Sequence, residues 1–600
     1  MSHRGKHSET KESRFARFGL QSDGSYRIPE GQLPRLMSTV GVGQIGGKAR
    51  GLLFVLHHME QGDILPGFQH LVRFPRSTVL TTQLFDEFME ENRLDQVVLA
   101  GCESPTRLAE IRDRFLAAEF PRQWEGALAD LLETHRGPLV VRSSSVMEDN
   151  PRYSFAGIYL SEFLPNNGSD ETRMARLTEA IKAVYASTFG PNARAYRKRH
   201  GLSWQEEKMA ILVQDMVGRE YAHDLFYPLV AGVSFSRNFY PWAPALSPED
   251  GAVRLVVGTG TRAVGREYAR VYSAARPGLR PEGQDTRTII RNSQETVDVL
   301  DLSVGRLAQR NLGELDNPLL ARICSVAHDD GTLRTPSTSL MGTNSGDRLV
   351  ATFERLIAGT RIMPFTPLMR ELMEYLENLM ALPVDVEFAV DFPPVGSGGS
   401  EGTPEFYILQ VRPLGSRRAH RRIRIPKLDR DLILLDCHRV LGNGTRRGLR
   451  HIIYVDPTTY RHDQGYETAR AVGRINELLD GAPYILMGPG RWASSNPQLG
   501  VPVQYSEIFE AAVIVEMSTE GFSPELSYGT HFYADMVASE ILYIPFYEAE
   551  GDHIHRDLLK TLEATAYGSC ITHYVAPAGL NVYVDGAGRR GVIALAEGVA

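Results

Sequence analysis

The strongest constraint on the fold is an alternation of apolar and polar side chains in two segments near residue 400. Residues 384–390 read Val-Asp-Val-Glu-Phe-Ala-Val, and residues 406–412 read Phe-Tyr-Ile-Leu-Gln-Val-Arg. Successive side chains of a β-strand point to opposite faces of the sheet, so each segment suits a strand with one apolar face and one polar face. A glycine-rich segment, residues 394–403, lies between them and can reverse the chain. The pattern predicts an antiparallel hairpin.

The polar face of this hairpin would collect groups suited to a metal–nucleotide site. The groups are Asp385, Glu387, Gln410 and Arg412. In the second strand, Leu409 and Val411 are expected on the opposite, apolar side. Oxygen ligands hold Mg²⁺, which bridges phosphate groups and neutralises the charge that develops on them. A solvated edge hairpin with a salt bridge would show the same pattern, and the alternation alone leaves both interpretations open.

Residues 138–161 place a cation and hydroxyl groups directly after a short apolar run. The run 139–141 ends at Arg142, three serines follow, and the acidic pair Glu148 and Asp149 comes next. A Ser-Phe-Ala-Gly turn then occupies residues 154–157. A buried strand followed by a guanidinium, hydroxyls and a glycine turn can present phosphate-binding groups from a rigid support. An ordinary loop at the end of a strand has the same composition.

A second glycine motif precedes this stretch. Gly46, Gly47 and Lys48 open an apolar-periodic segment, residues 44–56, that is typical of a helix. Glycines at the start of a helix allow backbone amides to approach a ligand closely. A plain turn before a helix is the alternative interpretation.

Taken together and in this order, the motifs resemble the ATP-binding, ATP-grasp domain of the phosphoenolpyruvate synthase and pyruvate phosphate dikinase family. The matching segments are GGK at 46–48, VRSSS with ED and SFAG at 141–157, VQDMV at 213–217, DVEF at 385–388 and LQVRP at 409–413. The resemblance covers roughly residues 36–415. It implies an α/β chain in which an ATP-grasp nucleotide-binding domain is joined to a smaller α/β domain.

The resemblance also implies roles for individual residues. Lys48, Arg142 and Arg412 would contact the phosphates and act as the catalytic cations. Glu387 and Gln410 would hold Mg²⁺, with Asp385 in support. The other nucleotide-binding positions would be Gly46, Gly47, Ser143, Ser154 and Gly157 around the phosphates and Gln214, Asp215 and Met216 at a hinge whose backbone grips the adenine. Thr261 stands where the family has a glutamate, so the acidic group of that turn is missing here.

Length and composition predict several domains in this chain. Six hundred residues correspond to roughly two to four domains. Residues 1–35 are polar and are expected to form a disordered tail, and 36–415 to form the nucleotide-binding domain. Within it, residues 273–295 lack periodicity and read as a linker-like excursion. A basic linker at 416–430 and a second α/β domain of unknown role at 431–600 would follow.

Charge, cysteines and hydropathy limit the partners and the compartment. The net charge of -8 is small for this length, so no nucleic-acid partner is predicted. Four well-separated cysteines without a CxxC pair argue against a disulfide framework or a structural zinc site and suit a reducing cytoplasm. No apolar run reaches the ~20 residues of a membrane helix, and the N-terminus lacks the apolar core of a signal peptide. None of these features predicts an oligomeric state.

Apolar periodicity predicts further elements. Helices are expected over residues 83–91, 104–135, 171–186, 319–329, 348–357, 366–382 and 466–479. Strands are expected within 74–82 and over 209–217, 229–235, 254–258, 452–455, 484–487, 512–517 and 542–546. A glycine turn is expected at 440–447, and the basic run 195–200 is expected on a solvated face.

Two features of the C-terminal part suggest a second site. Arg491 follows a predicted strand in the sequence Gly-Pro-Gly-Arg-Trp, which could offer amides and a guanidinium to an anion while Trp492 stacks on a ring. A rigid turn with a packed tryptophan explains the same residues. His531 and Asp535 are four positions apart and would share one helical face, where they could form a proton relay, a metal site or a phosphohistidine. A structural histidine is the alternative.

The sequence as a whole predicts an ATP- and Mg²⁺-dependent phosphotransferase with an unidentified acceptor. After residue 415 no segment resembles the family's swivelling phosphohistidine domain or its pyruvate-binding barrel, so pyruvate chemistry within this chain is not expected. A separate protein would then supply the histidine, or another acceptor would take the phosphoryl group. An ATP-binding regulatory or sensor module, favoured by Thr261, and a complete phosphoenolpyruvate synthase are the alternatives.

Overall fold

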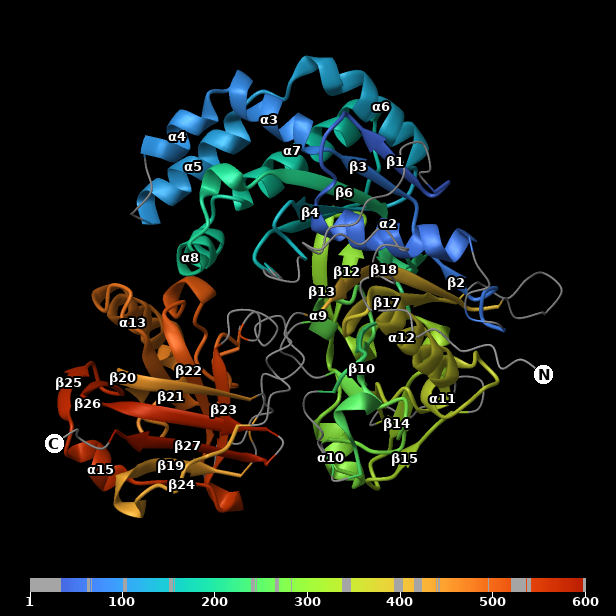
Figure 1. The fold of residues 1–600 in the computed structure, drawn as a ribbon. Coiled ribbons are helices and arrows are strands. Elements are labelled where there is room, and N and C mark those ends of the chain that lie inside the picture. The colour runs from blue at the N-terminus through green and yellow to red at the C-terminus, as the bar shows by residue number, and fades with distance from the viewer. Residues whose placement is uncertain are drawn as a thin grey trace, which may run out of the picture. The chain divides into compact units, whose positions relative to one another are not determined.

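The structure is a computed structural model whose described residues form two compact units (Figure 1). It describes residues 34–596 except for 62–64, 66, 101–104, 150–154, 156, 239–242, 244, 265–268, 282, 337–346, 393–402, 415–422, 439, 441–442, 495, 520–535, 537–540 and 587. The first unit comprises described residues of Met1–Tyr153, Tyr159–Thr188 and Glu207–Leu414, and the second those of Ser154–Ile158, Phe189–Glu206 and Gly415–Ala600. The predicted α/β fold is confirmed, because both units combine sheets with helices.

A five-stranded sheet in the first unit carries the Arg142 segment. Its order is β1 (Met37–Val40), β3 (Ser77–Leu80), β6 (Met209–Asp215), β4 (Leu139–Ser145) and β5 (Ser161–Leu164). Strands β1 and β3 are parallel, and the other neighbours are antiparallel. The central strand β6 is buried on both faces, which is what its nearly continuous apolar run predicts. The helices of this part are α2 (Gly46–Gln61), α3 (Thr82–Glu91), α4 (Leu94–Ala100), α5 (Pro105–Ala117), α6 (Glu125–Thr134) and α7 (Asp170–Ser187).

A six-stranded sheet contains the predicted hairpin. Its order is β11 (Arg270–Tyr272), β10 (Ala252–Val256), β9 (Val230–Phe235), β17 (Val384–Asp391), β18 (Glu405–Pro413) and β2 (Val72–Arg73). Strands β17 and β18 are antiparallel, with Asp385 opposite Arg412 and Glu387 opposite Gln410. The predicted hairpin and its shared polar face are therefore confirmed. In Figure 1, helix α2 lies between this sheet and the five-stranded sheet, and it contacts β4, β6 and β18.

One detail of the hairpin prediction is wrong. The register shifts between Glu387 and Phe388, so that Phe388 pairs with Ile408 and Leu409 is an extra residue in a β-bulge. Leu409 then packs on the face opposite Val411, against a small cluster that includes Ala389. Strict alternation would have placed Gln410 on the same side as Phe406 and Ile408, which are core residues. The bulge thus keeps the polar groups of β18 on the face of Glu387.

Helix α12 (Phe365–Met380) covers the apolar face of the hairpin. The predicted stripe on this helix is confirmed, because its members are buried in the main core of the unit: Leu368, Leu372, Met373, Leu376 and Leu379. The first strand contributes Val384, Val386, Phe388 and Val390 to the same core. A fixed apolar backing of this kind holds the polar face of the hairpin in place.

Two small sheets complete the first unit. One has the order β13 (Arg306–Asn311), β12 (Thr296–Asp301), β8 (Leu225–Tyr227) and β7 (Arg219–Tyr221), and the other β15 (Leu333–Arg334), β14 (Ser325–Ala327) and β16 (Arg348–Val350). Three short helices accompany them: α9 (Thr261–Val264), α10 (Thr286–Arg291) and α11 (Glu354–Ile357).

Several predicted elements of this region differ from the structure. Residues 319–329 form a short 3-10 turn followed by β14, and residues 348–357 form β16 followed by α11, so neither is one continuous helix. The apolar residues of these two segments pack beside a sheet and do not form one face of a helix. The linker-like stretch 273–295 contains helix α10 and the buried Gln294, whose side-chain amide is bonded on both sides to the backbone of Val257.

The second unit is built on one large sheet with the order β23 (Leu542–Tyr547), β22 (Ala511–Ser518), β21 (Tyr484–Pro489), β20 (Asn443–Val455), β26 (Ile571–Asp585), β27 (Arg590–Leu595), β19 (Ile433–Cys437) and β24 (His553–Ile554). Strand β25 (Glu563–Tyr567) pairs with β26. Strands β20 to β23 are parallel. The helices are α8 (Pro191–His200), α13 (Gly465–Leu478) and α15 (Arg556–Lys560). The described residues 443–447 belong to β20, so the predicted glycine turn is wrong there.

Helix α8 packs with the second unit, although its residues lie inside the range predicted for the nucleotide-binding domain. Tyr196 contacts Tyr505 at 5.7 Å between ring centroids, and Arg199 donates a hydrogen bond to the carbonyl of Ala511. Arg197 is buried as well. The basic run 195–200 is therefore not simply a solvated face, and the prediction for it is wrong.

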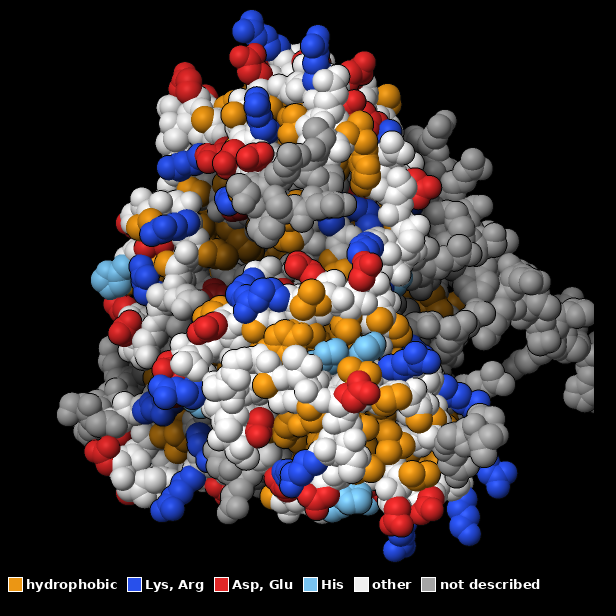
Figure 2. Space-filling view, turned by 90° about the vertical axis from the view of Figure 1, so that its left-hand side faces the viewer, with side chains coloured by type: hydrophobic (Ala, Val, Ile, Leu, Met, Phe, Trp, Pro, Cys, Tyr) orange, Lys and Arg blue, Asp and Glu red, His pale blue; other side chains and the backbone are white. Residues whose placement is uncertain are grey.

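The surface shows no dominant charge on the face drawn in Figure 2. Lys and Arg side chains are interspersed there with Asp and Glu side chains among the described residues. No helix within the described parts of the chain has the length and apolar character needed to cross a membrane.

Candidate functional site

The start of helix α2 packs tightly against strand β4 and the turn that follows it. A Cβ atom on Gly46 would lie 1.5 Å from the carbonyl oxygen of Ser144, and one on Gly47 would lie 1.6 Å from that of Glu148. The Ser144 hydroxyl accepts a hydrogen bond from Ala49 N at 3.0 Å and donates to the Ile45 carbonyl. The two glycines thus allow a backbone contact that places Lys48 over β4.

Gly47→Ala is expected to lower the free energy of unfolding by about 2–3 kcal/mol, because the added methyl group overlaps the Glu148 carbonyl. Chemical denaturation of the full chain measures the change. Gly126→Ala is the matched control: a Cβ on Gly126 in α6 would have no described atom within 4 Å, so this variant should be as stable as the wild type or more stable. Equal stability of the Gly47→Ala variant and the wild type would contradict this packing.

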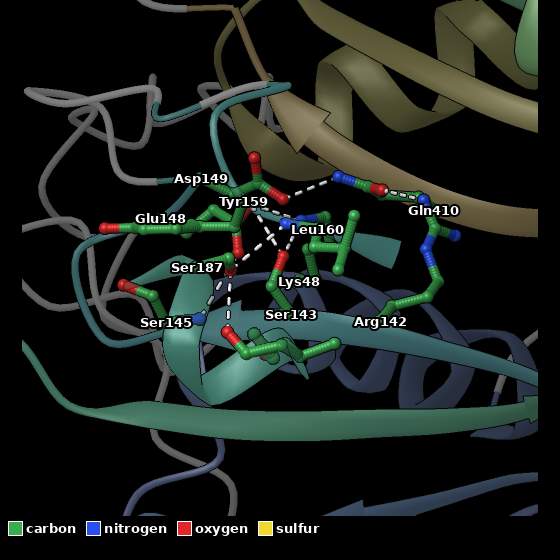
Figure 3. Close-up of polar contacts among 12 residues, drawn as sticks. Lys48, Arg142, Ser143, Ser145, Glu148, Asp149, Tyr159, Leu160, Ser187 and Gln410 are labelled. Carbon is green, nitrogen blue, oxygen red and sulfur yellow. Dashed lines mark hydrogen bonds and ion pairs between the residues drawn. The ribbon is translucent and has the colours of Figure 1, made fainter. Parts of the chain in front are cut away.

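Lys48 is paired with an acid from the turn after β4. Its ammonium forms a short ion pair with Glu148 and donates to Ser143 Oγ at 2.9 Å (Figure 3). The Glu148 carboxylate also accepts a hydrogen bond from the amide of Ser145 at 3.2 Å. Burial raises the pKa of Glu148, and the Lys48 ammonium opposes that rise. The pair is a buried, mutually dependent unit.

Arg142 connects strand β4 with both strands of the hairpin. Its Nη2 donates to Glu387 Oε2 and to Gln410 Oε1, each at 2.6 Å, and its Nη1 lies 3.4 Å from Gln214 Oε1. Figure 3 shows Gln410 between Arg142 and Asp149, and its Nε2 donates to Asp149 Oδ2 at 2.6 Å. Groups that are hundreds of residues apart in the chain are joined in one network.

Arg412 lies on the same face of the hairpin but is held by a different acid. Its Nε is 2.7 and 2.6 Å from the two carboxylate oxygens of Asp385, and both side chains are buried. Burial raises the pKa of Asp385, and Arg412 opposes the rise through its charge and its hydrogen bonds. In this structure each of the three predicted catalytic cations is neutralised by one carboxylate.

The predicted adenine hinge lies at the C-terminal end of strand β6. Gln214 is buried, and its Nε2 donates to Ser77 Oγ at 3.2 Å. The Asp215 carboxylate is 2.6 Å from Nδ1 of the buried His135, whose Nε2 lies 2.9 Å from Thr78 Oγ1. The backbone amide of Met216 donates to the Pro138 carbonyl. The side chains of Gln214 and Asp215 and the backbone amide of Met216 are thus already hydrogen-bonded within the protein.

The turn that contains Thr261 still has a carboxylate beside it, that of Asp298. Its hydroxyl donates to Asp298 Oδ2 at 2.6 Å, and Arg262 Nε donates to Asp298 Oδ1 at 2.8 Å. Asp298 belongs to β12, 37 positions further along the chain. Sequence reasoning missed this carboxylate because nothing local links it to the turn.

Oxygen donors suited to a divalent cation converge near Arg142. Glu387 Oε2 and Gln410 Oε1 approach the same guanidinium nitrogen, and Asp149 Oδ1 is buried and accepts no hydrogen bond from a described residue. Burial raises the pKa of Asp149, and Lys48 is the strongest of the cations that oppose the rise. The described residues include no cluster of three or more His, Cys, Asp or Glu side chains that could hold a metal. The oxygens of Glu387, Gln410 and Asp149 fit Mg²⁺, which binds through one or two carboxylates together with nucleotide phosphates.

The structure joins several of the predicted site residues in one network and leaves others outside it. Lys48, Ser143, Arg142, Glu387 and Gln410 are linked through the acidic pair 148–149. That pair was visible in the sequence as two acids after a serine run, but its contacts were not predicted. Ser154, His531 and Asp535 lie outside the described residues. Gly157 and Arg491 belong to the second unit.

The tryptophan beside Arg491 is a packed residue. Trp492 is fully buried, its Nε1 donates to the Val515 carbonyl at 3.2 Å, and its backbone amide donates to Glu516. A Cβ on Gly488 would lie 2.6 Å from its ring. The turn therefore matches the structural interpretation, and stacking of Trp492 on a ligand ring is wrong for this conformation.

Comparisons with known proteins agree with this geometry. A family model described as the pyruvate phosphate dikinase AMP/ATP-binding domain matches residues 42–431. A phosphoenolpyruvate synthase of Pseudomonas aeruginosa is 27% identical over 358 residues, which is 57% of this chain and 37% of the relative. The phosphoenolpyruvate synthase of Deinococcus radiodurans is 26% identical over 204 residues, or 32% of this chain and 23% of the relative.

A rifampicin phosphotransferase of a Streptomyces species is 28% identical over 192 residues, which is 30% of this chain and 20% of the relative. The matched region spans between 20% and 37% of the length of these three relatives. Because the family model covers more than half of the sequence, the chain belongs to the pyruvate phosphate dikinase AMP/ATP-binding domain family.

Proposed function

We propose that this chain binds Mg-ATP in its first unit and transfers a phosphoryl group from ATP to an acceptor. Membership of an ATP-binding family and the names of the relatives support ATP-dependent phosphotransfer. The observation that carries the proposal is the contact of Arg142 with Glu387 and Gln410, which lie 245 and 268 positions further along the chain. Lys48 is linked to the same network through the adjacent residues Glu148 and Asp149.

The proposed mechanism is electrostatic. Bound Mg²⁺ would neutralise charge on the transferring phosphoryl group. Glu387 and Gln410 would hold the cation, with Asp149 nearby. Lys48, Arg142 and Arg412 would orient the triphosphate by charge and hydrogen bonds. Each of these cations now faces a carboxylate, so phosphate oxygens would replace a carboxylate on at least Lys48 and Arg142.

The identity of the phosphoryl acceptor is a separate proposal. The relatives are named phosphoenolpyruvate synthase and rifampicin phosphotransferase, and each is matched over less than half of its length. We propose that the second unit selects the acceptor and that a histidine of another protein is one candidate. The described cysteines Cys324, Cys437 and Cys570 are free, which suits the reducing cytoplasm proposed as the site of action.

Incubation of the full chain with ATP and Mg²⁺ is expected to yield AMP and inorganic phosphate when the acceptor is present, because the family resemblance implies that the β-phosphoryl group goes to the acceptor and the γ-phosphate is released to water. Chromatographic separation of AMP, ADP and ATP measures the outcome. ADP would indicate simple kinase chemistry, and AMP formation that requires pyruvate would indicate a complete phosphoenolpyruvate synthase. A search for an acid-labile phosphohistidine on the chain or on co-purified proteins identifies the acceptor. Failure of the chain to bind ATP would refute the proposal.

A sensor that binds ATP without phosphotransfer is the second candidate. It is favoured by Thr261, which stands where the family has a glutamate. The nearby Asp298 supplies a carboxylate to that turn, but it is already bonded to Thr261 and Arg262. Bound ATP that remains intact in the presence of Mg²⁺ and cell extract would support the sensor.

A further inference from the structure

We propose that Asp149 is a positioning residue that fixes the side-chain amide of Gln410 so that its oxygen faces the cation site. This inference rests on the proposed Mg-ATP function and adds a role for a residue that the sequence motifs left unassigned. It depends on the two hydrogen bonds at the ends of the Gln410 amide, both of 2.6 Å.

The two neighbours of Gln410 permit only one orientation of its amide. An ionised carboxylate only accepts hydrogen bonds, so Asp149 requires the NH₂ end of the amide. A guanidinium only donates, so Arg142 requires the oxygen end. Rotation by 180° would place nitrogen against nitrogen and oxygen against oxygen. Since Gln410 is almost fully buried, water would not compensate for those mismatches.

This orientation decides whether Gln410 can serve the cation. Its Oε1 and Glu387 Oε2 both lie 2.6 Å from the same nitrogen of Arg142, so the two oxygens converge on one point that is already occupied by a positive group. Mg²⁺ takes oxygen ligands, and an amide nitrogen in place of Oε1 would remove one of them. Mutation of a residue that orients the ligand of a metal typically costs about 10–100-fold in metal affinity or activity.

The backbone of Asp149 suits this task. Its φ of 52° lies in the left-handed region, which aspartate and asparagine tolerate better than most residues. Asp149 directly follows Glu148, which holds Lys48. The turn therefore fixes one side chain from helix α2 and one from strand β18 at the same time. Asparagine would keep the shape of Asp149 but offers both a donor and an acceptor, so it would no longer select the orientation of Gln410.

The test measures Mn²⁺ affinity in the complex of the full chain with α,β-methylene-ATP, an analogue whose α–β bridge cannot be hydrolysed. Mn²⁺ serves as an EPR-visible substitute for Mg²⁺. Asp149→Asn is expected to weaken Mn²⁺ binding about tenfold. Gln410→Glu alone should also be impaired, because it brings two carboxylates into contact. In the double variant D149N/Q410E the amide stands at position 149 and the carboxylate at position 410, so a hydrogen bond between donor and acceptor is restored. This variant should bind Mn²⁺ within about threefold of the wild type.

Two controls separate this inference from a general effect of charge or stability. Asp391→Asn removes a carboxylate from the face of β17 that also carries Glu387. Asp391 pairs with Arg219, so this variant should leave the Mn²⁺ affinity unchanged. Thermal unfolding of every variant checks the fold. If the wild type fails to bind Mn²⁺ with the analogue, the proposed function is wrong. If the wild type binds and D149N matches it, or the double variant is no better than D149N, the role of Asp149 is wrong while the function stands.

Discussion

Arg142→Ala is expected to reduce ATP turnover by about three orders of magnitude. Arg142 contacts Gln214, Glu387 and Gln410 at the same time. Removing one preorganised group that stabilises developing charge typically costs 10²–10³-fold, and a phosphate-directed arginine can cost more. Steady-state rates of nucleotide release, measured as kcat and kcat/KM for ATP, test this. Glu387→Ala is expected to have an effect of the same order, because it removes a proposed ligand of the cation.

Arg142→Lys tests whether the reaction needs the shape of the guanidinium as well as its charge. Arg142→Lys keeps the charge but has a single ammonium in place of a planar fork, so it would not serve Glu387 and Gln410 with the same geometry. It should recover only part of the lost activity. Circular dichroism and thermal unfolding show whether each variant is folded at the assay temperature. A folded Arg142→Ala variant with turnover within threefold of the wild type would exclude a role for Arg142 in the reaction.

Lys48→Met is expected to lower the free energy of unfolding by about 3–5 kcal/mol at pH 8, besides abolishing turnover. Methionine fills the same space but leaves the carboxylate of Glu148 buried without its cation; the Glu148 side chain is only 1% exposed. Breaking a buried ion pair from one side is costly because the remaining charge loses its compensation. Urea denaturation in the absence of nucleotide measures the change.

The effect of Lys48→Met should depend on pH. Lys48 lowers the pKa of Glu148, so its removal raises a pKa that burial already holds above the ordinary value. A carboxyl group whose pKa is higher in the folded state than in the unfolded state loses stability as the pH rises between the two values. The difference between wild type and variant should therefore be small at pH 5 and grow towards pH 8.

The control for this prediction is the double variant K48M/E148Q. Glutamine is neutral at every pH in this range, so the double variant should be more stable than Lys48→Met at pH 8 and should show little pH dependence relative to wild type. If Lys48→Met has the same effect at pH 5 and pH 8, the charge of Glu148 is not what the lysine compensates.

The sequence by itself determined the hairpin and the residues of its polar face. Alternation with a period of two is a local property of a strand, so Asp385 and Glu387 could be assigned to one face without a tertiary structure. The apolar stripe of α12 was predictable for the same reason, because helical spacing is also local. Motif order, which linked Lys48 and Arg142 to the hairpin, is likewise present in the linear sequence.

Only the tertiary structure decided the register and the partners of these groups. The bulge at Leu409 brings Gln410 into line with Glu387, and the packing of Phe406 and Ile408 in the core on one side requires it. The contact of Asp149 with Gln410 joins positions 261 residues apart. Helix α8 packs with the second unit although its neighbours in sequence belong to the first. Such contacts depend on chain topology and on the packing of whole elements, and the local pattern of side chains contains neither.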